Sequence, residues 1–256
     1  MVLSLGRWTA GPLSGPLRHV ALDGETFGHH HKFGEMALAV CLARVQSLGA
    51  RLTVYGEYLE KSPPEHGVEI VGNTSWSCVH GVERWRADCG CNSGAHPGWN
   101  QAWRTPLRLA VDWLRDRLAE VFEERGKLLL TDPWRARDDY VSVILNDRRE
   151  NVERFLREHA SHPLGRRQQD EAISLLEMQR FGMLARSSDA WFFDDLSDLT
   201  TIQAMRCSRR ALELCRDAGG ADFEPEFAAL LQEAQSNVSE LGSGRNIFER
   251  FAARTY

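Results

Sequence analysis

The feature that most constrains the fold is the helical spacing of apolar residues in the second half of the chain. From Thr105 onward, apolar side chains recur at intervals of three and four residues, with Arg and Glu between them. The first such stripe consists of Leu107, Ala110, Val111, Leu114, Leu118, Val121 and Phe122. Asp132-Pro133 is typical of a helix start, because Asp is a good N-cap and Pro fits the first helical position. Further helices are expected at about 148–159, 168–186, 199–217 and 224–241, which predicts a helical bundle domain over 105–256.

The segment before the bundle has a different pattern. Residues 1–16 hold three Gly and two Pro with little periodicity, which predicts an irregular lead-in. Two short, mostly apolar runs at 17–22 and 51–55 are typical of strands, and a helical stripe that ends at Gly49 lies between them. Strand, helix and strand in this order predict a βαβ unit within an α/β domain over 17–104. Two strands do not form a sheet that is stable alone, so this α/β part is expected to be truncated.

Composition and charge exclude several classes of function. The chain has 256 residues and a net charge of −5, so no basic field is available to attract nucleic acid or anionic lipid. No apolar run approaches the roughly 20 residues that span a bilayer, and Gly and Pro interrupt the N-terminus where a signal peptide needs an apolar stretch. We therefore expect a cytoplasmic protein without nucleic-acid or membrane partners. Cys41, Cys207 and Cys215 lie in helical patterns and are expected to be buried.

Asp23 and Glu25 stand two residues apart at the end of the first predicted strand, in the sequence DGETFGHHH. If the extended conformation continues, both carboxylates point to the same side. Ligands of α/β proteins bind outside the carboxyl ends of the strands, so the pair is a candidate for acid–base catalysis, with His29 and His30 as substrate contacts. The alternative is an Asp at a turn followed by solvent-facing His residues. A metal site made from these side chains matches no common ligand spacing.

Residues 73–91 (NTSWSCVHGVERWRADCGC) concentrate Trp, Arg, His, Glu and Cys, and three interpretations remain open. In the first interpretation, the segment forms a sugar site. The flat side chain of Trp76 or Trp85 covers a pyranose ring, and Trp99 and Trp103 extend this aromatic surface. The polar side chains that would bind the sugar hydroxyls are His80, Glu83 and Arg84.

The other two interpretations of this segment concern its thiols. Cys78, His80, Cys89 and Cys91 can supply four tetrahedral zinc ligands, although structural zinc sites usually separate paired ligands by two to four residues. The third interpretation is a wall of packed aromatic side chains and buried thiols without a ligand. The prediction for this chain is that it holds no metal and no cofactor.

Residues 187–201 (SSDAWFFDDLSDLTT) place four acids and three aromatic residues between two helical patterns. A connection that only needs to turn does not require this composition, so Asp189, Trp191 and Asp194 are candidate substrate-binding residues. The alternative is structural: Asp198 or Thr200 caps the next helix, and the aromatic residues close the core of the bundle.

These three segments, in this order, resemble the family 57 glycoside hydrolases, the α-amylase and α-mannosidase-like group. They are most similar to an uncharacterised subgroup with its own C-terminal domain of unknown function, and the resemblance covers about residues 17–250. DGETFGHHHKFGE resembles the motif that begins with the general acid/base, which implies this role for Asp23, with Glu25 beside it. SSDAWFFDD resembles the last conserved region, which implies that Asp189 and Trp191 lie near substrate. The Cys-rich segment is similar to a signature of the subgroup, whose members are not known for catalytic zinc.

The resemblance also implies a fold and a missing part. The expected fold class is α/β plus all-α: the last βα units of an incomplete (β/α)7-type barrel, followed by a helical bundle, mostly helical overall. Retaining glycosidases need two carboxyl groups about 5–5.5 Å apart, and the family's nucleophile lies upstream of the position of Asp23. We therefore expect a truncated part of an enzyme that acts on α-glucan-like oligo- or polysaccharides and needs its N-terminal half as partner. The alternatives are a zinc-binding module, a non-catalytic sugar-binding protein or a structural remnant.

Overall fold

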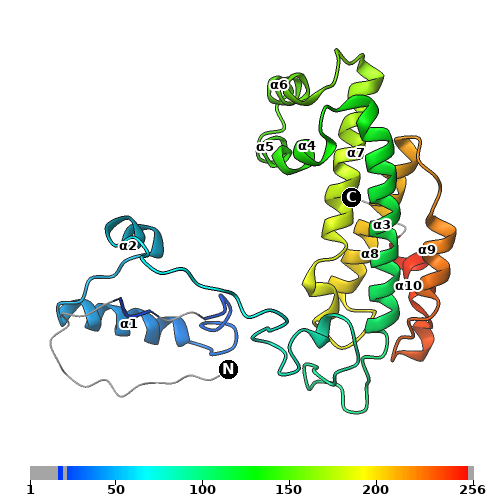
Figure 1. Cartoon of the computed structure of the whole chain (residues 1–256). Coiled ribbons are helices and arrows are strands. Elements are labelled where there is room, and N and C mark those ends of the chain that lie inside the picture. The colour runs from blue at the N-terminus through cyan, green and yellow to red at the C-terminus, as the bar shows by residue number, and fades with distance from the viewer. Residues whose placement is uncertain (1–16, 20–21, 253–256) are drawn as a thin grey trace. The chain divides into compact units, whose positions relative to one another are not determined.

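The chain divides into two compact units, one ending at Gly72 and one beginning at Asn73 (Figure 1). The structure is a computed structural model that describes residues 17–19 and 22–252. The predicted lead-in, residues 1–16, lies outside the described residues. Among the described helices, none is both long and apolar enough to cross a bilayer.

The first unit contains two helices, α1 (Gly34–Ser47) and α2 (Tyr55–Lys61). Helix α1 lies where the apolar stripe predicted it, but none of its residues is buried. Most of its apolar side chains face solvent, including Met36 with 64% exposure and Val40 with 70%. Cys41 is exposed as well, so the prediction that this thiol is buried is wrong. The described residues of this unit therefore have helical structure without a hydrophobic core of their own.

The predicted α/β fold class, with the last βα units of a barrel, is wrong. In the part of the chain that the structure describes, strand-like pairing is limited to isolated bridges, such as Phe27 with His31. Residues 51–54 are irregular, and Tyr55, expected at the end of the second strand, begins α2. An extended segment needs a neighbouring strand to satisfy its N–H and C=O groups, and the described residues of the two short apolar runs form no such pair; residues 20 and 21 of the first run lie outside the described residues.

The second unit is a helical bundle preceded by an irregular segment. Its α-helices are α3 (Arg104–Leu129), α4 (Pro133–Asp139), α5 (Val141–Leu145), α6 (Arg149–His159), α7 (Arg166–Leu184), α8 (Leu199–Asp217), α9 (Glu224–Leu231) and α10 (Gly244–Phe251). The described part of this unit also has three short 3-10 helices: η1 (Glu83–Trp85) precedes α3, η2 (Ser188–Trp191) lies between α7 and α8, and η3 (Ser239–Leu241) lies between α9 and α10. The long helices α3, α7 and α8 pack side by side, and α9 and α10 cover them (Figure 1).

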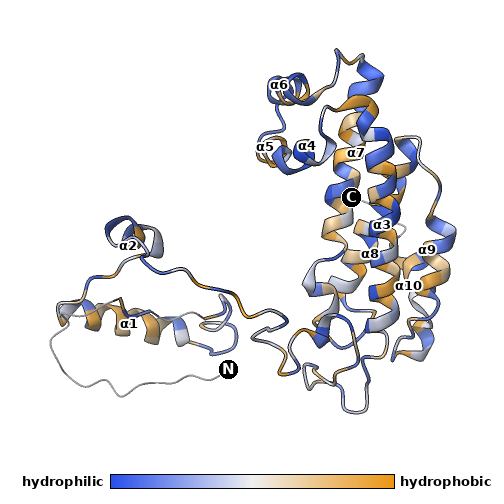
Figure 2. Cartoon of the chain, in the orientation of Figure 1, coloured by the Kyte–Doolittle hydropathy of each residue, from blue (hydrophilic) through white to orange (hydrophobic). Residues whose placement is uncertain are grey.

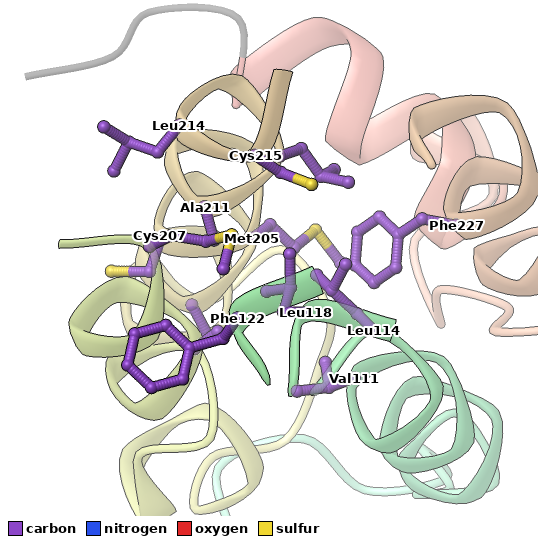
Figure 3. Close-up of a cluster of buried hydrophobic side chains, with 14 of the residues drawn as sticks. Val111, Leu114, Leu118, Phe122, Met205, Cys207, Ala211, Leu214, Cys215 and Phe227 are labelled. Carbon is purple, nitrogen blue, oxygen red and sulfur yellow. The ribbon is translucent and has the colours of Figure 1, made fainter. Parts of the chain in front are cut away.

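The core of the bundle is formed by the apolar stripes that the sequence predicted (Figure 3). Figure 2 shows these stripes as hydrophobic bands along the long helices. The labelled core side chains of Figure 3 are Val111, Leu114, Leu118, Phe122, Met205, Cys207, Ala211, Leu214, Cys215 and Phe227, each at most 5% exposed. Burying one such large apolar side chain stabilises the fold by about 1.5–3 kcal/mol. Cys207 and Cys215 are buried as predicted, and burial raises the pKa of Cys215 to about 11, which keeps it a neutral thiol.

Two helix starts confirm the capping pattern of the sequence. The Asp132 carboxylate accepts a hydrogen bond from the backbone N–H of Arg135 at the start of α4, where Pro133 occupies the first position. The Asp198 carboxylate accepts one from the N–H of Thr200 at the start of α8. Each cap satisfies a backbone donor that the helix itself leaves free.

Candidate functional site

The two chemically rich segments of the second unit meet at one end of the bundle. We call residues 73–103 the cap segment and residues 187–201 the connecting segment. The indole N–H of Trp85 donates to the carbonyl of Ser188 at 3.1 Å, and that of Trp103 donates to the carbonyl of Asp194 at 3.2 Å. Side chains about 100 residues apart in sequence therefore share one region, although sequence reasoning treated the two segments separately.

Asp194 and Trp191, both predicted to bind substrate, form hydrogen bonds that stabilise the contact between the cap segment and the connecting segment. Asp194 is 5% exposed, and its carboxylate accepts hydrogen bonds from the backbone N–H of Ser93, at 2.7 Å, and from the Ser93 hydroxyl. Trp191 is fully buried, and its indole N–H donates to the carbonyl of Arg104 at 3.1 Å. Trp191 thus lies in the core, as the structural alternative for this segment expected, and the Asp194 carboxylate binds protein atoms.

Asp195, which sequence reasoning did not select, holds a third segment in place. Its carboxylate is 3% exposed and accepts hydrogen bonds from Ser236 Oγ at 2.8 Å and from the backbone N–H groups of Ser197 and Asn237. Burial alone would raise the pKa of Asp195, but these hydrogen bonds to the charged form hold it below its ordinary value. The doubled Asp of the connecting segment was the only signal in the sequence that pointed to it.

The predicted substrate residues of the cap segment divide into exposed and buried ones. Trp76 is 80% exposed, while Trp85 is partly covered by its contact with the connecting segment. Glu83 forms an ion pair with Arg86, and the hydrogen bonds that the Arg86 guanidinium donates to it lower the pKa of the Glu83 carboxyl group. Arg84 is only 6% exposed, so its guanidinium is not available to a sugar hydroxyl. Of the predicted residues in the connecting segment, Asp189 is the exposed one.

Four potential metal ligands of the cap segment converge on one point. These are Cys78, His80, Cys89 and Cys91, and their Sγ and ring nitrogen atoms all lie within 4.8 Å of one another. Cys78 Sγ lies 3.9 Å from Cys89 Sγ and 4.0 Å from His80 Nδ1. Cys91 Sγ lies 3.8 Å from Cys78 Sγ and 3.6 Å from His80 Nδ1. We refer to these residues as the Cys3His cluster.

Two glycines shape the backbone around the Cys3His cluster. Gly81 follows His80 with φ +80°, its N–H donates to the carbonyl of Cys78, and a Cβ there would collide with the carbonyl oxygen of Asn73. Gly90 lies between Cys89 and Cys91 with φ +79°. These left-handed positions favour glycine, and they let a tight turn and a bend bring ligands separated by a single residue to the same point.

Hydrogen bonding around the cluster favours the thiolate form of Cys78. Burial alone would raise the pKa of Cys78, but hydrogen bonds from the backbone N–H groups of Arg84 and His80 lower it to about 7. The fully buried side chain of Arg104 also approaches the cluster, with its Nη1 atom 4.0 Å from Cys89 Sγ. For Cys91 the pKa is raised, because burial and the neighbouring Cys78 and Cys89 disfavour a further negative charge.

The remaining predicted site residues lie in the first unit. Asp23, Glu25, His29 and His30 are all exposed, on the turns that precede α1. The carbonyl of Asp23 accepts a hydrogen bond from the N–H of Thr26, and Glu25 lies 3.6 Å from His30 Nε2. Asp23 thus belongs to a turn rather than to a strand end, and its role as acid/base stays a prediction.

One comparison with known proteins gives a match. A family model described as a domain of unknown function (DUF3536) matches residues 99–255, from the end of the cap segment through the bundle. The chain belongs to the DUF3536 family. No curated protein and no solved structure matches this DUF3536 chain.

Proposed function

We propose that the DUF3536 chain is a carbohydrate-binding helical domain of a protein that acts on α-glycans and resembles the family 57 glycoside hydrolases. The observation that carries the proposal is the contact between the cap and connecting segments at one end of the bundle. These are two of the three segments that resemble that family, and the hydrogen bond from Trp85 to Ser188 joins them. Segments distant in sequence that carry aromatic and acidic side chains to one place are typical of a ligand site.

Trp76 is the exposed aromatic residue that we expect to contact the sugar. An indole with 80% exposure leaves a large flat apolar face in water, although its burial would be favourable. The C–H face of a pyranose ring matches such a surface, while the sugar hydroxyls need polar partners. Asp189, exposed on the connecting segment, and the partly exposed Glu83 can supply acceptors for those hydroxyls.

The buried residues have a supporting role in this proposal. Trp191 and Asp194 hold the two segments together, so that the exposed side chains keep fixed positions. Hydrolysis is a separate step that the family resemblance assigns to Asp23. Turnover of α-glucans by this chain that is lost in Asp23→Asn and kept in Glu25→Gln would support this role for Asp23, and it would overturn the expectation that the chain lacks its nucleophile.

Titration calorimetry with maltooligosaccharides tests the binding proposal. We expect the full chain to bind them and Trp76→Ala to weaken the affinity by about tenfold, which corresponds to about 1.4 kcal/mol. Tyr55→Ala is the matched control, because it removes an exposed aromatic ring from the first unit and leaves the cap segment intact. Equal affinity of Trp76→Ala and the unmodified chain, or no binding by the unmodified chain, would contradict the proposal.

A further inference from the structure

We propose that the Cys3His cluster binds one zinc ion, and that this ion fixes the fold of the cap segment. The four ligands come from a tight turn, Cys78 to Gly81, and from a bend at Gly90 between Cys89 and Cys91, and every pair of ligand atoms lies within 4.8 Å. This inference stands on the geometry of the cluster and does not depend on carbohydrate binding.

The spacing between the ligand atoms matches tetrahedral zinc. Zinc–sulfur bonds of about 2.3 Å and zinc–nitrogen bonds of about 2.0–2.1 Å require sulfurs about 3.8 Å apart and sulfur–nitrogen pairs about 3.6 Å apart in a tetrahedron. The observed Sγ–Sγ distances from Cys78 are 3.9 Å to Cys89 and 3.8 Å to Cys91. The distances to His80 Nδ1 are 4.0 Å from Cys78 and 3.6 Å from Cys91.

The chemistry of the ligands selects zinc and a structural role. The three cysteines are free thiols, and their Sγ atoms stand well beyond the roughly 2.05 Å of a disulfide. Three soft thiolates and one imidazole in a tetrahedral arrangement are typical of structural zinc. Four protein ligands close the coordination sphere, so no position is left for a reactive water.

Two buried arginines supply the charge balance of such a site. Arg104 is fully buried and Arg84 is 6% exposed, and within the described residues neither forms an ion pair with a carboxylate. Arg104 Nη1 approaches Cys89 Sγ, and its Nη2 donates to the carbonyl of Phe193 at 3.2 Å. A buried guanidinium needs a compensating negative charge nearby. Zinc with three thiolates and a neutral His carries a net charge of −1 and supplies it, together with the nearby Asp194 carboxylate.

The position of Arg104 connects the ion to the bundle. Arg104 is the first residue of α3, and its carbonyl accepts the indole N–H of Trp191 in the connecting segment. A zinc ion that holds Cys89 in place therefore also holds the contact through which the cap segment reaches α3 and the connecting segment. The loss of the ion is expected to loosen the cap segment while the long helices stay packed.

Metal analysis of the full chain tests the proposal. After purification under reducing conditions and dialysis against metal-free buffer, we expect inductively coupled plasma mass spectrometry to find one zinc ion per chain. Cys89→Ser and Cys91→Ser are expected to lose the zinc. Cys41→Ser is the matched control, because it removes an exposed thiol outside the cluster and is expected to keep the full zinc content. Replacing His29, His30 and His31 by Ala excludes metal held by that exposed run.

Cobalt substitution tests the site in the unmodified chain, so its result does not depend on whether a variant folds. Zinc is removed from the unmodified chain with a chelator, and Co(II) is added. We expect intense thiolate-to-cobalt charge-transfer bands and the visible bands of a tetrahedral site, with one equivalent at saturation. Absence of zinc together with no such cobalt spectrum would overturn the proposal, as would iron in place of zinc. Undiminished zinc in both serine variants would assign the ion to another place and overturn it equally.

Discussion

Helices α1 and α3 carry similar apolar stripes, but the stripe of α3 is buried and that of α1 is not. Helix α1 buries none of its residues, whereas α3 buries ten, among them Leu114 and Phe122. The spacing of apolar residues determines that each segment is helical and which of its faces is apolar. Burial depends on partners, and α3 packs against α7, α8 and α9. Most helical stability in proteins comes from such packing rather than from propensity, so the two units are expected to differ greatly in stability.

The largest effect is expected when the two units are separated. A chain comprising residues 73–256 should unfold in one cooperative transition at the melting temperature of the full chain, because the bundle core lies entirely within it. Residues 1–72 alone should show no cooperative transition, because α1 has no buried face. Differential scanning calorimetry measures both, and a sharp heat-absorption peak from residues 1–72 would contradict the contrast between the units.

A matched pair of leucine substitutions tests the same contrast within the intact chain. Leu175 of α7 is fully buried, so Leu175→Ala should lower the free energy of unfolding by about 2–5 kcal/mol. Leu48, just after α1, is 59% exposed, and Leu48→Ala should change it by less than about 0.5 kcal/mol. Urea denaturation monitored by circular dichroism gives both values, and similar losses would show that α1 is packed in solution.

Asp195 is expected to make the second unit sensitive to acid. Because hydrogen bonds hold the pKa of this carboxyl below its unfolded value, its contribution is present above the unfolded pKa and is lost as pH falls through the folded pKa. Asp195→Asn should lower the free energy of unfolding at neutral pH by about 1–3 kcal/mol and reduce its decline on acidification. Asp23→Asn is the control, since this exposed carboxyl belongs to the first unit. An unchanged acid dependence in Asp195→Asn would refute the assignment.

The smallest effect concerns a helix cap of the bundle. Asp198 accepts the N–H of Thr200 at the start of α8, so Asp198→Ala should cost about 1 kcal/mol of stability. Asp170→Ala, an exposed acidic position within α7, should cost less than about 0.5 kcal/mol. Chemical denaturation distinguishes the two, and equal effects would mean that the cap contributes little.

Only part of the candidate site could be predicted from local sequence patterns. The cysteine, histidine and tryptophan content of residues 73–91 marked the segment as unusual, but the one-residue ligand spacing argued against zinc. The structure brings the four side chains together because Gly81 and Gly90 adopt left-handed conformations that no spacing rule shows. Arg104 had no signal in the sequence, which predicted the helix from Thr105 onward, and its burial beside Cys89 became visible only in three dimensions.

The sequence by itself determined the local features: the positions of the long helices, the cap at Asp132, a cap at Asp198 or Thr200, and the apolar face that α3 buries. These follow from periodicity and hydrogen bonding within a few residues, which need no distant partner. Only the tertiary structure decided that α1 stays exposed, that no sheet forms among the described residues, and that the cap segment meets the connecting segment. These outcomes depend on contacts between residues far apart in the chain, and a stripe of apolar residues does not specify which surface will cover it.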